Sequence, residues 1–231
     1  MTPSTRKTNQ EQGFLGRQVG NMIRRSVRKN FHSINYIGSA PPRHDPCIVV
    51  PNHHGWHDGY LMFLLLKKLN LNFVDWVAEY DAFPLFGRVG GLPFPADDPG
   101  RRAATIRRTL RLMKAGDTNL LLFAEGILHR PPEILAFGRS LEVVAKQVPR
   151  AKVIPVAIRY ELSLHERPDA YIYVGTPVEA GDELAARTRL AVKLLLDELS
   201  VKIKFHAEEF QTLHAGTPDV NERWDMRRLK L

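Results

Sequence analysis

The stretch from residue 51 to residue 59 concentrates side chains that can move protons. Three histidines and one aspartate lie within six residues, namely His53, His54, His57 and Asp58. Histidine changes its protonation state near neutral pH, and a neighbouring carboxylate can fix its tautomer and stabilise its cation. Such a pair can remove the proton from a hydroxyl group and make that oxygen a nucleophile. The sequence therefore predicts a site of acid–base catalysis in this stretch.

An apolar segment on each side of this stretch indicates how it is positioned. Residues 48–50 read Ile-Val-Val, which is typical of a buried strand, and residues 59–69 read as an apolar helix. The histidines would then occupy a loop at the carboxyl end of a strand. Open α/β sheets hold their ligands at such loops.

Strand and helix patterns alternate along the rest of the chain. We expect strands at 72–78, 119–123, 153–160 and 171–174, and helices at 100–115, 139–146 and 182–213, the last as one long helix or two short ones. The alternation predicts an α/β fold with a mostly parallel central sheet flanked by helices. We place the main domain at 43–215, between an N-terminal amphipathic helical segment at 1–42 and a tail at 216–231.

The N-terminal segment carries most of the excess positive charge. The 231 residues include 33 Lys and Arg against 25 Asp and Glu, a net charge of +8, and +6 of it lies in the first 45 residues. On a helix over residues 13–31, apolar side chains fall on one face and basic side chains on the opposite face. Such a basic amphipathic helix either packs on the body of the protein or binds an anionic membrane surface, and both readings stay open.

Cysteine content and hydropathy limit the compartment. Cys47 is the only cysteine, which excludes an internal disulfide and a cysteine-cluster zinc site and suits a reducing compartment. The longest apolar run, residues 60–66, is far shorter than the roughly 20 residues of a membrane-spanning helix, and no secretory signal is present. We expect a cytoplasmic protein, peripheral on the inner face of the membrane.

Four motifs resemble, in their order along the chain, those of the glycerolipid and lysophospholipid acyltransferase family. The first is Asn52-His53, four further residues and Asp58. The other three are Gly91-Leu92-Pro93-Phe94, Phe123-Ala124-Glu125-Gly126 and Val153-Ile154-Pro155-Val156. The α/β fold of that family agrees with the pattern of strands and helices. Four motifs in order are a far more specific signal than any one of them.

The resemblance implies transfer of a fatty acyl group from acyl-CoA or acyl carrier protein to a hydroxyl of a lipid acceptor. His53 would be the catalytic base and Asp58 its orienting partner. The substrate-binding positions would be Gly91, Phe94, Glu125, Gly126, Arg130 and Pro155. The acyl donor is itself a substrate, so we expect no cofactor. We expect no metal, because the histidine stretch lacks a known ligand pattern and no downstream histidine or aspartate set obviously completes one. The expected partners are the donor, the acceptor and an anionic membrane surface, without nucleic acid; the oligomeric state is left unassigned.

Two positions depart from the pattern of the phosphate-recognising members. Asp97 stands where those members carry an arginine after the second motif, and Leu128 stands where the third motif usually ends in arginine. A carboxylate in place of a cation repels a phosphate dianion. This predicts an acceptor other than lysophosphatidic acid, such as a sugar or another neutral hydroxyl on a lipid, unless Arg101, Arg102 or Arg130 substitutes.

The residues alone leave other readings open. His53-His54-x-x-x-Asp58-Gly59 also matches the His-His-x-x-x-Asp-Gly motif of larger CoA-dependent acyltransferases and peptide condensation domains, in which His54 is the base. A metal-dependent hydrolase would use the same histidines as ligands. A non-catalytic basic module that binds lipid or nucleic acid would need only the charge.

Overall fold

The computed structural model describes residues 13–41, 44–116, 118–162 and 164–224. Eight strands form one sheet in the spatial order β4-β3-β5-β2-β6-β7-β1-β8. The strands are β1 (Ser33–Gly38), β2 (Cys47–Pro51), β3 (Phe73–Val77), β4 (Gly91–Pro93), β5 (Asn119–Leu121), β6 (Lys152–Glu161), β7 (Asp169–Val174) and β8 (Gln211–Ala215). Neighbouring strands are parallel except for the pairs β6–β7 and β1–β8. The expected mostly parallel sheet is confirmed.

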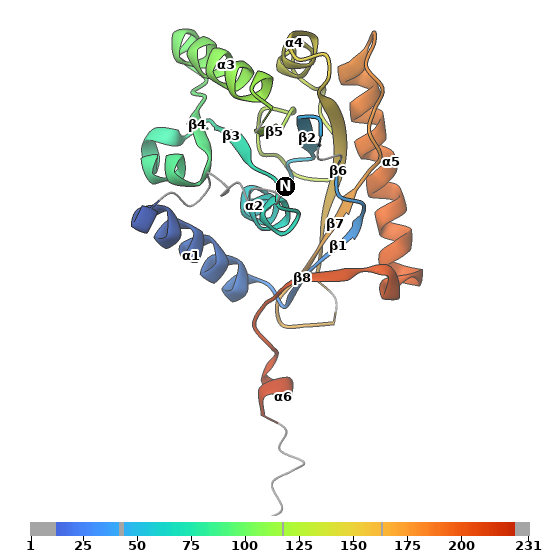
Figure 1. Ribbon diagram of the computed structural model, residues 1–231. Coiled ribbons are helices and arrows are strands. Elements are labelled where there is room, and N and C mark those ends of the chain that lie inside the picture. The colour runs from blue at the N-terminus through green and yellow to red at the C-terminus, as the bar shows by residue number, and fades with distance from the viewer. Residues whose placement is uncertain (1–12, 42–43, 117, 163, 225–231) are drawn as a thin grey trace, which may run out of the picture.

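Helices cover both faces of this sheet (Figure 1). They are α1 (Gly13–Asn30), α2 (Asp58–Lys68), α3 (Pro99–Lys114), α4 (Ser140–Gln147), α5 (Leu184–Phe205) and α6 (Val220–Arg223), with short 3-10 helices η1 (Tyr80–Ala82), η2 (Pro84–Val89) and η3 (Ala207–Glu209). Within the described ranges, none of these helices has the length and apolar character needed to cross a bilayer.

Side chains of β2 alternate between two hydrophobic cores, as the pleat of a strand requires. Val49 joins the core formed with α1 and α2, whereas Ile48 and Val50 join the core formed with α3 and α4. All five residues of β2 are buried, which explains its continuous apolar sequence. The histidine loop follows directly from the carboxyl end of this central strand.

The N-terminal helix packs its apolar face on the protein. Val19, Ile23 and Val27 are buried in the same core as the leucines of α2. The basic side chains Arg17, Arg25 and Arg28 remain exposed. After α1 the chain forms β1, which pairs with β7 and β8 in the main sheet. The segment before residue 42 therefore contributes a strand as well as a helix.

Residues 206–213 do not continue the helix that the sequence predicted for 182–213. Helix α5 ends at Phe205, and β8 then pairs antiparallel with β1. The prediction was wrong at this end because β8 gains its hydrogen bonds from a partner more than 170 residues earlier, which local periodicity does not report. Strand β1, also absent from the sequence prediction, depends on the distant strand β7 in the same way, and the short strand β4, likewise not predicted, pairs with β3.

Candidate active site

The loop between β2 and α2 begins with Asn52, whose side chain forms hydrogen bonds with β6 as the backbone of a neighbouring strand would. The Asn52 side chain accepts a hydrogen bond from Ile158 N (2.7 Å) and donates one to Ile158 O (3.0 Å). This side chain is fully buried, so its pairing with β6 satisfies backbone groups that would otherwise be buried without partners. The pairing sets the position from which the next residue, His53, projects.

His53 and Asp58 form a hydrogen-bonded pair. The distance from His53 Nδ1 to Asp58 Oδ2 is 3.0 Å, and the Asp58 side chain is 0% exposed. Asp58 Oδ2 also accepts a hydrogen bond from Gly55 N (2.8 Å), and Oδ1 accepts one from the Tyr160 hydroxyl. An ionised carboxylate that accepts from all three donors fixes His53 with its proton on Nδ1. The lone pair is then on Nε2, on a side chain that is 23% exposed.

Asp58 lies at a helix N-terminus and beside the Tyr160 hydroxyl. Asp58 is the first residue of α2, where the positive end of the helix dipole stabilises an anion. Burial, followed by the charge of Asp58 and the hydrogen bond to it, raises the pKa of Tyr160 well above its usual range, so Tyr160 remains a donor. A Cβ atom at position 55 would lie 2.3 Å from Tyr160 Cε2. Only glycine permits this close approach of the loop to Tyr160.

Glu125 supports the backbone of His53. Its Oε1 accepts a hydrogen bond from His53 N (2.8 Å), and its Oε2 accepts from Leu135 N (2.7 Å) and contacts His129 Nε2 (2.6 Å). The Glu125 residue is only 8% exposed. The carboxylate that resembles an acceptor-binding residue in the third motif thus has contacts that position the His53 backbone. The His53 ring also packs on Phe123, with 4.3 Å between ring centroids.

The other two histidines of the loop have different surroundings. His54 Nδ1 lies 3.1 Å from the Asn52 amide nitrogen, a donor, and His54 Nε2 lies 2.9 Å from the Glu133 carbonyl, an acceptor. Both ring nitrogens of His54 are therefore engaged by the protein. His57 contacts Ser26 and Phe31, and burial lowers the pKa of His57. Within the described parts of the chain, Asp58 accepts a hydrogen bond from His53 and from no other histidine.

The remaining expected substrate-binding residues lie at several places. Gly91 begins the edge strand β4, and Phe94, directly after it, stacks on Trp76 with 4.4 Å between ring centroids. Gly126 has a φ of 77° and turns the chain after Glu125. Pro155 is buried in β6, where its carbonyl accepts a hydrogen bond from Gly175 N (2.9 Å). Arg130 is exposed in the loop that follows Gly126.

The arginines near the second motif already have partners. Arg101 forms two hydrogen bonds with the Asp81 carboxylate, at 2.6 and 2.9 Å. Arg102 donates to the carbonyls of Pro95 and Ala96. Asp98 caps α3 by accepting from Arg101 N (2.8 Å), and the neighbouring Asp97 is exposed. Neither Arg101 nor Arg102 presents an unpaired guanidinium in place of the missing cations.

A mostly parallel α/β sheet with a histidine–aspartate pair at the end of its central strand is the architecture that the four motifs implied. The chain belongs to the acyltransferase family, because the sequence model described as Acyltransferase matches residues 30–159. No curated protein matches the chain. The similar solved structures include the crystal structure of the 1-acyl-sn-glycerophosphate (LPA) acyltransferase PlsC from Thermotoga maritima. It has a TM-score of 0.56 and 18% sequence identity over 79% of each chain, which shows a shared fold.

Proposed function

We propose that this protein transfers a fatty acyl group from acyl-CoA or acyl carrier protein to a hydroxyl of a lipid acceptor, with His53 as the base. The observation that carries this proposal is the 3.0 Å contact between His53 Nδ1 and the buried Asp58 carboxylate. Membership of the acyltransferase family supplies the reaction class. The engagement of both ring nitrogens of His54 favours His53 over His54 in this role.

The chemistry follows from the tautomer that Asp58 selects. His53 Nε2 accepts the proton of the acceptor hydroxyl while that oxygen attacks the thioester carbonyl, and Asp58 stabilises the imidazolium that forms. The tetrahedral intermediate then collapses, the carbon–sulfur bond breaks, and the proton on Nε2 passes to the leaving thiolate. The new ester and the free thiol account for all atoms, and no covalent acyl-enzyme is needed.

We also propose that the acceptor hydroxyl belongs to a lipid without a phosphate next to it. Asp97 and Leu128 replace the two cations of the phosphate-recognising members, while Arg101 and Arg102 are occupied by Asp81 and by backbone carbonyls. Arg130 remains exposed and is the arginine most able to contact a substrate phosphate. A sugar or other neutral headgroup needs none of these cations.

The proposed place of action is the inner surface of an anionic membrane. The exposed basic side chains of α1 offer an electrostatic contact with anionic lipid. Trp56, in the same loop as His53, is 66% exposed, and Phe14 at the start of α1 is equally exposed. Aromatic side chains of this kind favour the membrane–water interface. Surface contact at this loop would bring the acceptor to His53.

The test is acceptor-dependent release of thiol from acyl-CoA. His53→Ala should lower the rate by about 10²–10⁴-fold, because it removes the base. His54→Ala is the matched control from the same loop and should cause a much smaller loss. Circular dichroism checks that both variants fold.

Two results would contradict the proposal. In one, His54→Ala abolishes turnover while His53→Ala preserves it, which would make His54 the base. In the other, thiol release by the wild-type protein does not depend on any acceptor hydroxyl, which would indicate a thioester hydrolase.

A further inference from the structure

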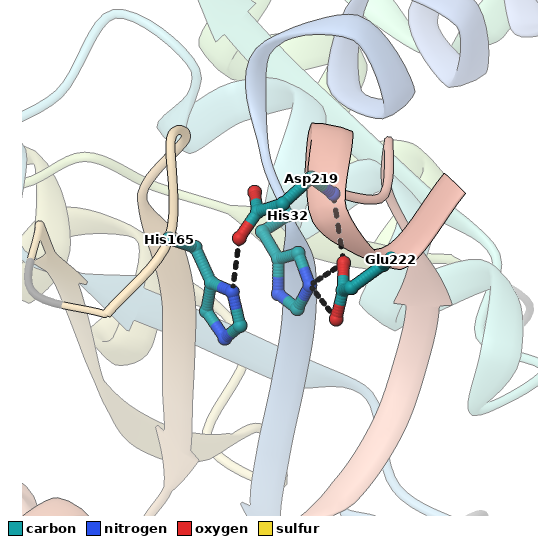
Figure 2. Close-up of side chains that lie close together, drawn as sticks. All are labelled: His32, His165, Asp219 and Glu222. Atoms are coloured by element: carbon teal, nitrogen blue, oxygen red, sulfur yellow. Dashed lines mark hydrogen bonds and ion pairs between the residues drawn. The ribbon is translucent and has the colours of Figure 1, made fainter. Parts of the chain in front are cut away.

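A second cluster of titratable side chains lies outside the histidine loop, where three distant segments meet (Figure 2). His32 directly precedes β1, and His165 lies between β6 and β7. Asp219 and Glu222 belong to the C-terminal segment at α6. Each of the four offers one ligand atom, and these atoms all lie within 4.8 Å of one another.

The hydrogen bonds of His32 leave one of its ring nitrogens facing a carboxylate. His32 Nδ1 lies 3.1 Å from Asp169 Oδ1, which also accepts from the Ser33 hydroxyl at 2.6 Å. Asp169 is thus an acceptor, and His32 Nδ1 carries the proton. On the other side of the ring, His32 Nε2 lies 3.1 Å from Glu222 Oε2. A neutral imidazole has a single N–H, so a positive charge is required at Nε2 beside Glu222, either as a second proton on His32 or as a bound metal ion.

His165 brings a second imidazole to the same place. Its ring stacks on His32 with 3.4 Å between centroids, and its Nδ1 lies 2.7 Å from Asp219 Oδ2. Figure 2 shows the two rings side by side, with the carboxylates of the C-terminal segment reaching toward them. Two imidazole nitrogens and two carboxylate oxygens therefore converge, and these are the ligand types that Zn²⁺ accepts.

Three of the four ligands are oriented by a further hydrogen bond, as is usual around protein metal ions. Asp169 orients the His32 ring through the hydrogen bond at Nδ1. Asp219 Oδ1 accepts from Glu166 N (3.1 Å), which leaves Oδ2 directed at His165. Glu222 Oε2 accepts from Asp219 N (2.7 Å) in a capping box, so the two carboxylates hold each other's position.

Charge and access also suit a cation. Three carboxylates, those of Asp169, Asp219 and Glu222, surround two imidazoles, so a divalent ion would offset an excess of negative charge. A cavity of about 380 Å³ opens beside the cluster and is lined by His32, Glu222 and Gly216, among others. It offers a path by which an ion can reach the ligands.

We propose that His32, His165, Asp219 and Glu222 bind one divalent transition-metal ion, Zn²⁺ being the best fit. Four protein ligands leave no open coordination position, so the ion has a structural role. It fastens the C-terminal segment to β1 and to the segment between β6 and β7. To coordinate one ion with both His32 Nε2 and His165 Nδ1, the two stacked rings must move apart so that both nitrogens face the ion.

This site departs from the expectation, drawn from the sequence, that the protein holds no metal. That expectation was drawn from the histidine stretch at residues 51–59, which lacks a known ligand pattern. Here His165 and Asp219 are 54 residues apart, and His32 and Glu222 are 190 residues apart. No local spacing reports such a set.

The test is calorimetric titration of the full chain, freed of metal with a chelator, with Zn²⁺ near pH 7.5. We expect one tight site. Glu222→Gln should weaken binding at least about 100-fold, and Asp169→Asn, which removes only the orienting carboxylate, by about 10–100-fold. His206→Gln is the matched control, because His206 lies in an exposed cluster with Glu208 and Glu209 and should leave the affinity unchanged.

A second readout separates ligand loss from misfolding. Zn²⁺ should raise the melting temperature of the wild-type protein and fail to do so for Glu222→Gln, whose side chain is 42% exposed and whose circular dichroism should match the wild type. Binding of Co²⁺ should give the visible absorption of a tetrahedral site in the wild type alone.

Three outcomes would overturn the proposal. The wild-type protein could fail to bind Zn²⁺, in which case a proton on His32 provides the cation that the geometry requires. Tight binding could survive both Glu222→Gln and Asp169→Asn, which would place the ion at His54, Glu125 and His129. Tight Zn²⁺ binding could also be lost in His206→Gln. None of these readouts depends on acyl transfer.

Discussion

Asp58 has three hydrogen-bond donors, two from its own loop and one from a distant strand. His53 Nδ1 and Gly55 N belong to the loop itself, whereas the Tyr160 hydroxyl comes from β6, 102 residues away. A buried carboxylate needs such donors for stabilisation. In the proposed mechanism, Tyr160 is therefore a positioning residue that acts on His53 through Asp58.

We predict that Tyr160→Phe lowers kcat by about ten-fold or more. A hydrogen bond to a charged group contributes about 1.5–3 kcal/mol, and each 1.36 kcal/mol is ten-fold in rate. Without this donor, the Asp58 carboxylate orients His53 less well, whereas no substrate contact is removed. KM should therefore change little while kcat falls, a split that a general loss of structure would not produce.

Tyr173→Phe is the matched control for this substitution. The Tyr173 hydroxyl also donates to a carboxylate, that of Glu198, at 2.9 Å on the outer part of β7 and α5. It should leave both kcat and KM unchanged. An unchanged kcat in Tyr160→Phe, or an equal loss of kcat in Tyr173→Phe, would contradict the positioning role.

At the scale of elements, α1 packs most of its apolar face on the protein. Val19, Ile23 and Val27 are buried in the core shared with α2 and are not available to lipid, whereas Phe14 and Leu15 in the first turn are exposed. Its basic face remains exposed, and the final turn ends with Arg28 and Lys29. The helix can therefore pack on the protein and still offer charge to a membrane.

We predict that Arg17→Glu/Arg25→Glu/Arg28→Glu weakens binding to vesicles containing anionic phospholipid by about a hundred-fold or more. Each basic residue at such a surface contributes about 1 kcal/mol, and 1.4 kcal/mol is ten-fold in affinity. Sedimentation with vesicles measures the change, and added salt should reduce the binding of the wild-type protein.

The control makes the same change of charge on α3. Arg107, Arg108 and Arg111 are exposed there, on the side of the sheet opposite α1 (Figure 1). Arg107→Glu/Arg108→Glu/Arg111→Glu should retain most of the vesicle binding. If the α3 variant loses as much binding as the α1 variant, net charge alone accounts for the interaction.

At the scale of the whole molecule, the net charge of +8 does not indicate a phosphate-bearing acceptor. Much of the excess lies on and around α1, while Arg101 and Arg102 beside the second motif have partners within the protein. The excess of positive charge in the first 45 residues is therefore no evidence for a phosphate-binding site.

The corresponding prediction concerns acceptor choice. With acyl-CoA as donor, lipids with a sugar or another neutral hydroxyl should be acylated faster than lysophosphatidic acid, as measured by mass spectrometry of the products. Arg130→Ala should have little effect on the rate of acylation of the neutral acceptor. Efficient acylation of lysophosphatidic acid that Arg130→Ala abolishes would show that Arg130 replaces the missing cations and that the acceptor carries a phosphate.

The sequence by itself determined the central elements and the pair His53 and Asp58. Strands such as β2 and helices such as α2 follow from hydrophobic patterns within a few residues, and a base and its partner five residues apart form a local signal. The mostly parallel sheet followed from the alternation of those elements.

Only the tertiary structure decided which residues complete the sites. Tyr160 reaches Asp58 across 102 residues, Glu125 reaches the His53 backbone across 72, and His32 meets Glu222 across 190. Strand β8 likewise required β1 as its partner. The physical reason is the same in each case: burial of the sheet brings these segments together, and hydrogen bonds between distant residues leave no periodic trace in the chain.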